Sequence, residues 1–572
     1  MNPKTLVLLE YPKILAKLKS FAGFSASQDL AEVLRPTSSL EKAQALQQQT
    51  REARALLTIN DEISFTGSVD LRQMVSRAAR GVTLEAAELI EIRNTLIISR
   101  TARRILLERR QEAPSLSAQA ELLSEGKGLI DLINKTISER GEVLDSASDR
   151  LGHIRSDMKV TQTRLMERMT RFINEPHSSH MLQENLITQR AGRYVLPLKA
   201  EFKGQIPAII HDQSASGATL FIEPLAVVEW NNKYRELELA ERDEVLRILH
   251  DLSGRIAEQA ESLKQMVETM AVLDLALMKA RYAEELDATE PILVPFLPHP
   301  PAHHPGSVIH LRRVRHPLLN QQNVVPIDVE LDSQTFVLVL TGPNTGGKTV
   351  TLKTVGLAVL MAQSGLQIPA QSGSTLSMFR DVFADIGDEQ SIEQSLSTFS
   401  GHITQLVQIL RKADYRSLVL LDELGAGTDP QEGSALARAV LTHLISRKIT
   451  CFVATHYPEL KAFAHVTPGA TNASLEFDLA TLRPTYHLMI GLPGRSNALA
   501  IAERLGLKQE IIELARSEIN PTDLHADDLL DEIRRQRDLA KESYDRAEQF
   551  RREAESDRNK VNALLEQMET EK

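Results

Sequence analysis

The stretch from Phe336 to Thr349 constrains the fold of this 572-residue chain more than any other part of the sequence. An apolar, β-branched run, Phe336 to Leu340, has the composition of a buried parallel strand. It leads into Gly-Pro-Asn-Thr-Gly-Gly-Lys-Thr, which fits the phosphate-loop pattern G-x-x-x-x-G-K-[ST]. An apolar helical segment, Val350 to Gln363, follows. A strand, a glycine-rich loop and a helix in this order predict a nucleotide-binding α/β domain.

The residue types of this loop suit phosphate chemistry. Glycines let the backbone turn its N–H groups toward phosphates, and the N-terminus of the next helix favours anions. We expect Lys348 to reach the β- and γ-phosphates and the Thr349 hydroxyl to hold Mg²⁺. A glycine-rich turn that binds nothing is the alternative, which the strand–loop–helix order disfavours. The predicted nucleotide-binding residues are Gly342, Pro343, Asn344, Thr345, Gly346, Gly347, Lys348 and Thr349.

Two further apolar runs end in polar residues that suit nucleotide hydrolysis. Residues 417–421 precede Asp422, which we expect to hold Mg²⁺, and Glu423, which we expect to polarise the attacking water. Residues 449–454 lead to His456, a candidate for sensing the γ-phosphate. Solvated acids and a surface or capping histidine are the alternatives. The predicted catalytic residues are Glu423, His456 and Lys348.

These motifs together resemble the ABC-type ATPases, and within them the MutS family. About seventy residues separate Lys348 from Asp422, which leaves little room for the large helical subdomain of ABC transporters. In that interval, residues 395–402 (SLSTFSGH) resemble the signature loop of MutS proteins. The phosphate loop itself also has the MutS form. The resemblance implies ATP and Mg²⁺ as cofactors.

The family pattern also implies a homodimer. In ABC-type ATPases each nucleotide lies between two protomers, and the signature loop comes from the second one. The resemblance therefore places Ser397, Thr398 and Ser400 in trans, with Asp429 near the same interface, and brings Asn344 to the γ-phosphate. Residues 425–427 (GAG) depart from the pattern, because MutS proteins often carry an arginine in the middle of this loop.

Composition restricts the cellular context. The net charge of −11 carries no global basic signal, so nucleic-acid binding would depend on local patches. The one cysteine, Cys451, rules out an intramolecular disulfide and suits a reducing compartment. No apolar stretch approaches the length of a membrane span, and the N-terminal apolar run is too short for a signal peptide. We therefore expect a cytoplasmic protein without a membrane partner.

The N-terminal half is predicted to be helical. Residues 1–125 have apolar residues at helical spacing, and turn chemistry at 35–38 and 64–68 separates the helices, which predicts a helical core. No mixed α/β domain and no Phe-x-Glu wedge of the mismatch-repair proteins precedes this core. Among MutS relatives this organisation resembles the second bacterial type, which lacks the mismatch-recognition domain.

Residues 126–290 are predicted to form two long lever helices with an inserted clamp. The levers are expected at about 130–175 and 225–285, and period-two segments with glycine breaks predict a β-rich tip at 186–224. The tip carries the candidate nucleic-acid contacts Arg190, Arg193, Lys199 and Lys203. Interspersed acids make a solvated sheet face an equal alternative. Binding here would be independent of sequence and sensitive to salt.

The remaining boundaries follow from proline and charge. Residues 291–306 are predicted to be a proline-rich linker, and 307–521 an ABC/MutS-type ATPase domain with Val325 and Ile327 near the adenine. We assign no metal to His299, His303 and His304. Residues 522–572 are expected to form a charged helix. The RNA-binding barrel and Smr nuclease domain of many family members are absent from this sequence, so we expect no nuclease activity of it.

The predicted fold class is therefore α plus α/β. It comprises a helical core, lever helices with a β-rich clamp, and a phosphate-loop ATPase domain with a C-terminal helix. Two cargoes are implied by the family resemblance: stalled or collided ribosomes, contacted through rRNA and split into subunits, or branched DNA, where binding suppresses recombination. A structural clamp with a degenerate ATPase is a third reading. The complete set of hydrolytic residues argues against it.

Overall fold

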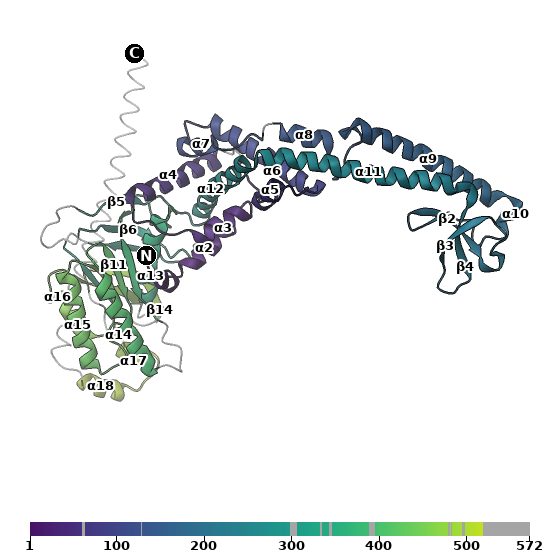
Figure 1. Cartoon of the computed structure of the whole chain (residues 1–572). Helices are drawn as coiled ribbons and strands as arrows, with labels where there is room; N and C mark the ends of the chain where they lie inside the picture. The colour runs from purple at the N-terminus through teal and green to yellow at the C-terminus, as the bar shows by residue number, and fades with distance from the viewer. Residues whose placement is uncertain are drawn as a thin grey trace, which may run out of the picture. The chain divides into compact units, whose positions relative to one another are not determined.

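The computed structural model describes most of the chain, with helices and sheets both present as the sequence predicted (Figure 1). The described residues are 1–59, 63–126, 128–297, 306–331, 334–342, 346–387, 395–478, 481, 483–492, 494 and 498–518. Contacts divide the chain into two compact units. The phosphate-loop unit comprises 1–21, 32–51 and the residues from 278 onward, and the helical unit comprises 22–31 and 52–277.

A six-stranded sheet organises the phosphate-loop unit. Its order is β10 (Asp381–Asp385), β11 (Ser417–Leu421), β12 (Thr450–Ala454), β8 (Val337–Thr341), β13 (Ala470–Asp478) and β14 (Arg483–Ile490). All neighbours pair in parallel except β13 and β14, which are antiparallel. The strand that carries the phosphate loop, β8, therefore lies inside the sheet. One strand, β12, separates it from β11.

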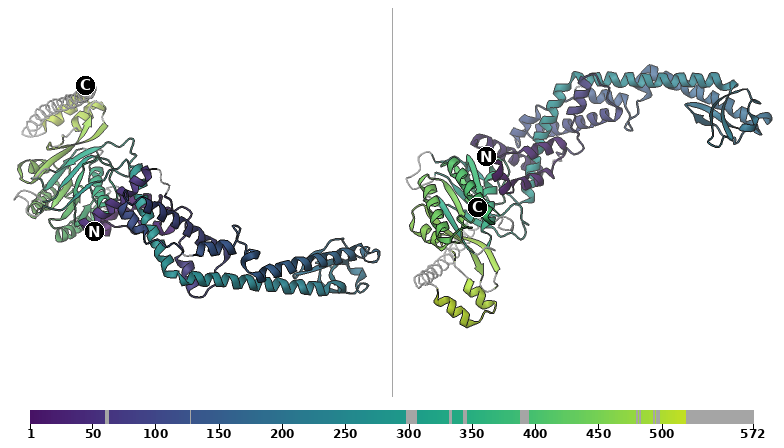
Figure 2. Two further views of the ribbon diagram at one scale, coloured as in Figure 1. Left: turned by 90° about the horizontal axis from the view of Figure 1, so that it is seen from above. Right: turned by 60° about the horizontal axis from the view of Figure 1, so that its bottom comes forward.

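Helices cover both faces of this sheet (Figure 2). Side chains of alternate strand residues, such as Val337, Val419 and Val453, pack on one face against three helices. These helices are α14 (Ser395–Lys412), α15 (Pro430–Ser446) and α16 (Pro458–Val466). On the other face, α13 (Lys348–Gln363) comes so close that a Cβ on Gly356 would lie 2.7 Å from the Leu420 side chain. The apolar runs are near-continuous because both faces are buried.

A second, four-stranded sheet belongs to the same unit. Its order is β5 (Ile292–Val294), β9 (Thr375–Ser377), β6 (Ile309–Val314) and β7 (Ile327–Glu330). The strand β5 falls within the predicted linker, whose prolines and histidines between 298 and 305 lie outside the described residues. Other helices of this unit are α1 (Pro3–Leu8), α2 (Tyr11–Lys19), α17 (Ala498–Arg504) and α18 (Gln509–Ser517). The predicted C-terminal helix, 522–572, also lies outside the described residues.

Helices make up most of the helical unit. Four of them are α5 (Arg72–Ala79), α6 (Ala86–Glu108), α7 (Pro114–Ala120) and α8 (Leu129–Thr136). The unit boundary falls inside α3 (Ser25–Val33), α4 (Leu40–Thr58) and α12 (Ala260–Glu285). Each predicted lever is interrupted. A turn with an Ile137–Val143 bridge separates α8 from α9 (Asp149–Asn174), and Gln259 separates α11 (Leu225–Glu258) from α12.

An antiparallel sheet lies in the chain between α9 and α11. Its order is β1 (Thr188–Arg190), β2 (Arg193–Lys199), β4 (Thr219–Pro224) and β3 (Ala208–Gln213), and a short helix, α10 (Pro176–Ser179), precedes it. A two-residue turn with positive φ at Ala191 and Gly192 joins β1 to β2, as right-handed strand twist favours. Leu196, Leu198 and Ile222 pack with Leu165 and Met169 of α9. This sheet and its α9 contacts are called the clamp below.

No helix among the described residues combines the length and apolar composition needed to cross a membrane.

Candidate nucleotide site and clamp

The predicted nucleotide residues follow the carboxyl ends of β8, β11 and β12, where parallel sheets bind ligands. Gly342 (φ +143°) and Gly347 (φ +93°) adopt backbone conformations that side chains rarely allow, and Gly347 is the N-cap of α13. Pro343, Asn344 and Thr345 lie outside the described residues. The loop residues that are described thus lead directly into a helix N-terminus, a favourable place for phosphates.

Lys348 is held at this helix start. Its Nζ donates a hydrogen bond to the Gly342 carbonyl (2.9 Å) and lies 3.0 Å from Nε2 of His456. Burial lowers the pKa of Lys348 to about 8, although Asp422 and Glu423 act in the opposite direction. The ammonium therefore lies in the loop beside two carboxylates, and a phosphate would favour its charged form.

Thr349 and Asp422 meet although they lie far apart in sequence. The Thr349 hydroxyl donates to Asp422 Oδ2 (2.5 Å), while Asp422 Oδ1 is buried without a hydrogen-bond partner in the described part of the chain. Burial is the main cause that raises the pKa of Asp422. An orphaned, buried carboxylate oxygen beside a hydroxyl suits a hard cation. These two residues fit Mg²⁺, which typically takes one or two protein ligands together with substrate phosphates.

Glu423 has an unusual backbone. Its φ is +51°, a conformation that costs free energy for any residue other than glycine. Its N–H donates to the Ala454 carbonyl at the end of β12 (3.0 Å), and its Oε1 lies 3.8 Å from His456 Nε2. The strained turn therefore keeps Glu423 beside His456 and Lys348, as a water-polarising carboxylate requires.

The predicted signature residues lie at the start of α14. The side chains of Ser397 and Thr398 lie outside the described residues, and Ser400 is exposed. A helix N-terminus with an exposed hydroxyl such as that of Ser400 suits phosphate binding. Because the contact is expected from a second copy, its role stays a prediction. Asp429 caps α15 by accepting hydrogen bonds from the N–H groups of Gln431 and Glu432.

His402 and Asp385 form a pair that sequence reasoning did not find. Nδ1 of His402, on α14, lies 3.1 Å from both carboxylate oxygens of Asp385, the last residue of β10. The Asp385 carboxylate raises the pKa of His402. The Asp385 carbonyl in turn accepts the N–H of Asp422 (2.8 Å). This pair ties the helix that carries the signature loop to the strand beside Asp422.

A pocket of about 450 Å³ adjoins the phosphate loop. Gly346, Gly347, Val325, Ile327 and Tyr486 line it, so both residues expected near the adenine face this space. Tyr486, with φ +62°, lies so close to Gly347 that a Cβ there would be 3.2 Å from the ring. An apolar pocket with an aromatic ring beside the loop suits a purine base. No local motif marks Tyr486 in the sequence.

Three of the four candidate clamp cations have contacts inside the clamp. Arg190 lies over the Phe221 ring (4.3 Å) and 3.4 Å from Asp212, and Lys199 donates to the His180 carbonyl (3.1 Å). Lys203 is exposed. These contacts are those of a solvated sheet face, and nucleic-acid binding by Arg190, Lys199 and Lys203 stays a prediction.

Arg193 has a structural role. It donates to both carboxylate oxygens of Glu223, which is fully buried, and His211 Nε2 lies 2.5 Å from the same carboxylate. A buried carboxylate needs such partners. The sequence showed Arg193 as one cation among several, because its partners Glu223 and Asn232 lie on β4 and α11.

Comparison with known proteins adds to this geometry. Residues 338–522 match the family described as MutS domain V. The chain is 45% identical over 545 residues to Endonuclease MutS2 of Geobacillus sp. (strain WCH70), which covers 95% of this chain and 68% of that relative. It is 44% identical to Endonuclease MutS2 of Geobacillus thermodenitrificans (100% and 72% covered). The protein of the same name from Thermomicrobium roseum is 48% identical (94% and 68% covered).

Proposed function

The chain belongs to the MutS2 family, and on this premise we propose that it is an ATP-hydrolysing, Mg²⁺-dependent clamp that works as a homodimer. Its proposed cargo is the stalled or collided ribosome, gripped through rRNA and split into subunits by an ATP-driven change of conformation. The proposed domains are a helical core (1–125), lever helices with an inserted clamp (126–290), a linker (291–306), an ATPase domain (307–521) and a charged helix (522–572).

One observation carries the proposal of hydrolysis: five residues from three strand ends meet at one place. Lys348 contacts His456, Thr349 contacts Asp422, and Glu423 lies beside His456. In the proposed reaction, Lys348 neutralises the phosphates and Glu423 polarises the attacking water. Bound Mg²⁺ would supply further charge neutralisation between the β- and γ-phosphates. Thr349 and Asp422 would hold it.

The same chemistry supports dimerisation. In the family pattern, the signature loop with Ser397 reaches the nucleotide from a second copy. ATP would then join two protomers, and hydrolysis would release them. This sequence of events would convert nucleotide turnover into opening and closing of the clamp.

Branched DNA is the alternative cargo, with suppression of recombination as the outcome. The proposal includes neither mismatch repair nor nuclease activity, although the relatives carry "endonuclease" in their names. It also excludes a degenerate ATPase, because the hydrolytic set is complete. ATP turnover that is lost in Lys348→Ala and kept in Lys461→Ala would rule out a degenerate ATPase.

The test uses Glu423→Ala protein, which should bind ATP without hydrolysing it and so remain in the closed dimer. It is sedimented with ribosomes and, separately, with a DNA junction, each at physiological salt with ATP or ADP. ATP-dependent ribosome association, with subunit splitting by the unmutated protein, is the expected result. Tight junction binding without ribosome association would assign the clamp to DNA instead.

A further inference from the structure

Helix α9 carries a row of three arginines that the nucleotide chemistry does not use. Arg164, Arg168 and Arg171 follow each other at spacings of four and three, so they share one face of the helix. All three are exposed, and none forms an ion pair within the described residues. Arg155 of the same helix differs, because it pairs with Asp145 (2.6 Å) and Glu241 (2.7 Å).

The single tryptophan of the chain orders two of these side chains. The guanidinium carbons of Arg164 and Arg168 lie 5.5 and 5.6 Å from the centroid of the Trp230 ring. Trp230 is partly buried against the clamp core, which makes the ring a fixed support. A cation–π contact attracts the charged guanidinium to the ring without requiring its N–H groups as hydrogen-bond donors. Most N–H donors therefore remain available to a ligand.

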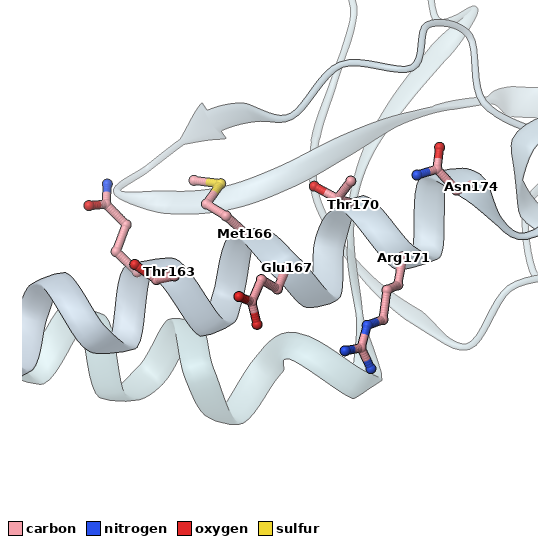
Figure 3. A pocket seen from close by; sticks show the side chains of 7 residues that line it. Thr163, Met166, Glu167, Thr170, Arg171 and Asn174 are labelled. Atoms are coloured by element: carbon pink, nitrogen blue, oxygen red, sulfur yellow. The ribbon is translucent and has the colours of Figure 1, made fainter.

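Two like charges beside one ring repel each other unless an anion lies between them. No carboxylate fills this role in the described chain. The nearest acids in sequence are Asp157 and Glu167 on α9, Glu175 directly after it and Glu229 on α11, and none forms an ion pair with the three arginines in the described part of the chain. Glu167 and Arg171 point to the same side of α9 and remain unpaired (Figure 3). Among the described residues the row thus has no ion-paired carboxylate, and Glu167 is the acid that lies beside it.

A polar hollow of about 520 Å³ adjoins Arg171 (Figure 3). Its lining includes Thr163, Thr170 and Asn174, whose hydroxyl and amide groups suit sugar and phosphate oxygens, and also Glu167, whose carboxylate would repel a phosphate placed next to it. From Arg164 to Arg171 the helix rises about 10 Å, and along the axis of a duplex each strand advances about 3.4 Å per phosphate. The row therefore matches three or four phosphates in length.

We propose that Arg164, Arg168 and Arg171, supported by Trp230, bind the sugar–phosphate backbone of nucleic acid along α9. This site lies on the helix and differs from the sheet residues Arg190, Arg193, Lys199 and Lys203. It rests on the proposed function only in that the clamp is taken to grip nucleic acid. Recognition is by charge and is independent of sequence, because no residue of the row is placed to distinguish bases.

The test compares Arg164→Gln/Arg168→Gln with Arg100→Gln/Arg104→Gln. The control pair has the same spacing, is also exposed and lies on α6 of the same unit, but has no aromatic support. Affinities for a DNA duplex and an RNA duplex of the same sequence are measured from 0.05 to 0.3 M salt, values on the order of those used for such slopes. The α9 variant should bind at least about tenfold more weakly at 0.15 M salt and lose about two units of salt slope.

The control variant should retain both affinity and slope. Trp230 emission should change when nucleic acid is added, since phosphates would alter both cation–π contacts. Equal affinities and slopes for the two variants, or silent Trp230 emission at saturation, would overturn the proposal. Arg164→Lys/Arg168→Lys, which keeps the charge, should keep the slope and serves if the glutamine variant unfolds.

The outcomes also separate this inference from the proposed function. If the protein binds duplexes through the three arginines but does not hydrolyse ATP, the inference on α9 stands and the proposed ATPase activity is refuted. If the protein hydrolyses ATP but the α9 variant binds duplexes as tightly as the unmutated protein, the ATPase activity stands and the inference on α9 is refuted. Preference for RNA or for DNA in the unmutated protein identifies which backbone the row takes.

Discussion

The ammonium nitrogen of Lys348 lies 3.0 Å from Nε2 of His456, 108 positions later in the chain. The two residues follow β8 and β12, which pair in parallel, so the strand register brings their side chains together. Glu423, which follows β11, lies 3.8 Å from the same histidine nitrogen. His456 therefore joins the phosphate-binding lysine to the carboxylate expected to activate water.

We expect His456→Ala to lower kcat for ATP by about a hundredfold while KM changes little, because the histidine acts on the transition state more than on ground-state binding. Lys348→Ala should lose most of its turnover and also raise KM strongly. Steady-state turnover measurements separate the two effects. Similar increases of KM in both variants would refute the distinct role of His456. His465→Ala, on α16 and away from the strand ends, is the matched control.

Tyr486 should contribute to nucleotide affinity through its ring. Tyr486→Ala should weaken ATP binding by about tenfold, since stacking on a base contributes about 1–3 kcal/mol, and Tyr486→Phe should retain the affinity. Titration with a fluorescent ATP analogue measures both. Tyr415→Ala, another half-exposed tyrosine, should have no effect. If Tyr486→Phe binds as weakly as Tyr486→Ala, the ring is not the contributing group.

The His402–Asp385 pair should position α14 rather than react. We expect His402→Gln to reduce kcat by about tenfold with nucleotide affinity unchanged, because the start of α14 loses its tie to the strand beside Asp422. His402→Asn and Asp385→Asn should give similar losses. A nucleotide-binding assay should show no loss of affinity in these variants, while turnover falls. Weaker ATP binding in His402→Gln would instead point to direct contact with the nucleotide.

Lys279 should make stability depend on pH. Its Nζ donates to the Ser364 carbonyl just after α13 (2.8 Å), and burial lowers its pKa from 10.5 to about 7. The unfolded chain therefore holds more protons between pH 7 and 10.5, so the free energy of unfolding rises with pH across that window. Below pH 7 Lys279 is charged in the folded state too, so the full desolvation cost of the buried ammonium lowers the free energy of unfolding.

Lys279→Met removes this dependence. We expect the variant to be more stable than the unmutated protein at pH 6.5 and to lose that advantage by about 1.4 kcal/mol per pH unit above pH 7, as the lysine becomes neutral in the fold. The unpaired Ser364 carbonyl then leaves a cost of about 1–3 kcal/mol. Scanning calorimetry at several pH values measures the difference. A gap that does not change with pH would contradict the prediction.

Arg193 should stabilise the clamp sheet. Arg193→Ala leaves the buried Glu223 carboxylate with His211, and we expect a loss of about 2–3 kcal/mol, at the low end for a broken buried pair because Arg193 is partly exposed. Hydrogen exchange of β2, β3 and β4 amides should accelerate. Adding Glu223→Gln should restore part of the protection. Unchanged exchange in Arg193→Ala would return this residue to the set of candidate nucleic-acid contacts.

Local chemistry was sufficient to predict several parts of this protein. A β-branched run, a glycine-rich loop and a following apolar segment predict β8, the phosphate loop and α13, because strand, turn and helix preferences act between residues adjacent in the chain. The ends of two further strands, after residues 421 and 454, were also predicted from the sequence, since continuous apolar runs are typical of strands buried on both faces. The mixed helical and sheet content followed from the two hydrophobic periods.

Only the tertiary structure decided which distant side chains meet. The strand order brings His456 to Lys348, the β10–α14 packing brings His402 to Asp385, and the return of β14 brings Tyr486 to Gly347. Likewise, Arg193 was a free cation by sequence and a partner of buried Glu223 in the fold. Residue type determines what a side chain can bind. Strand order and packing between segments remote in the chain determine what lies within its reach.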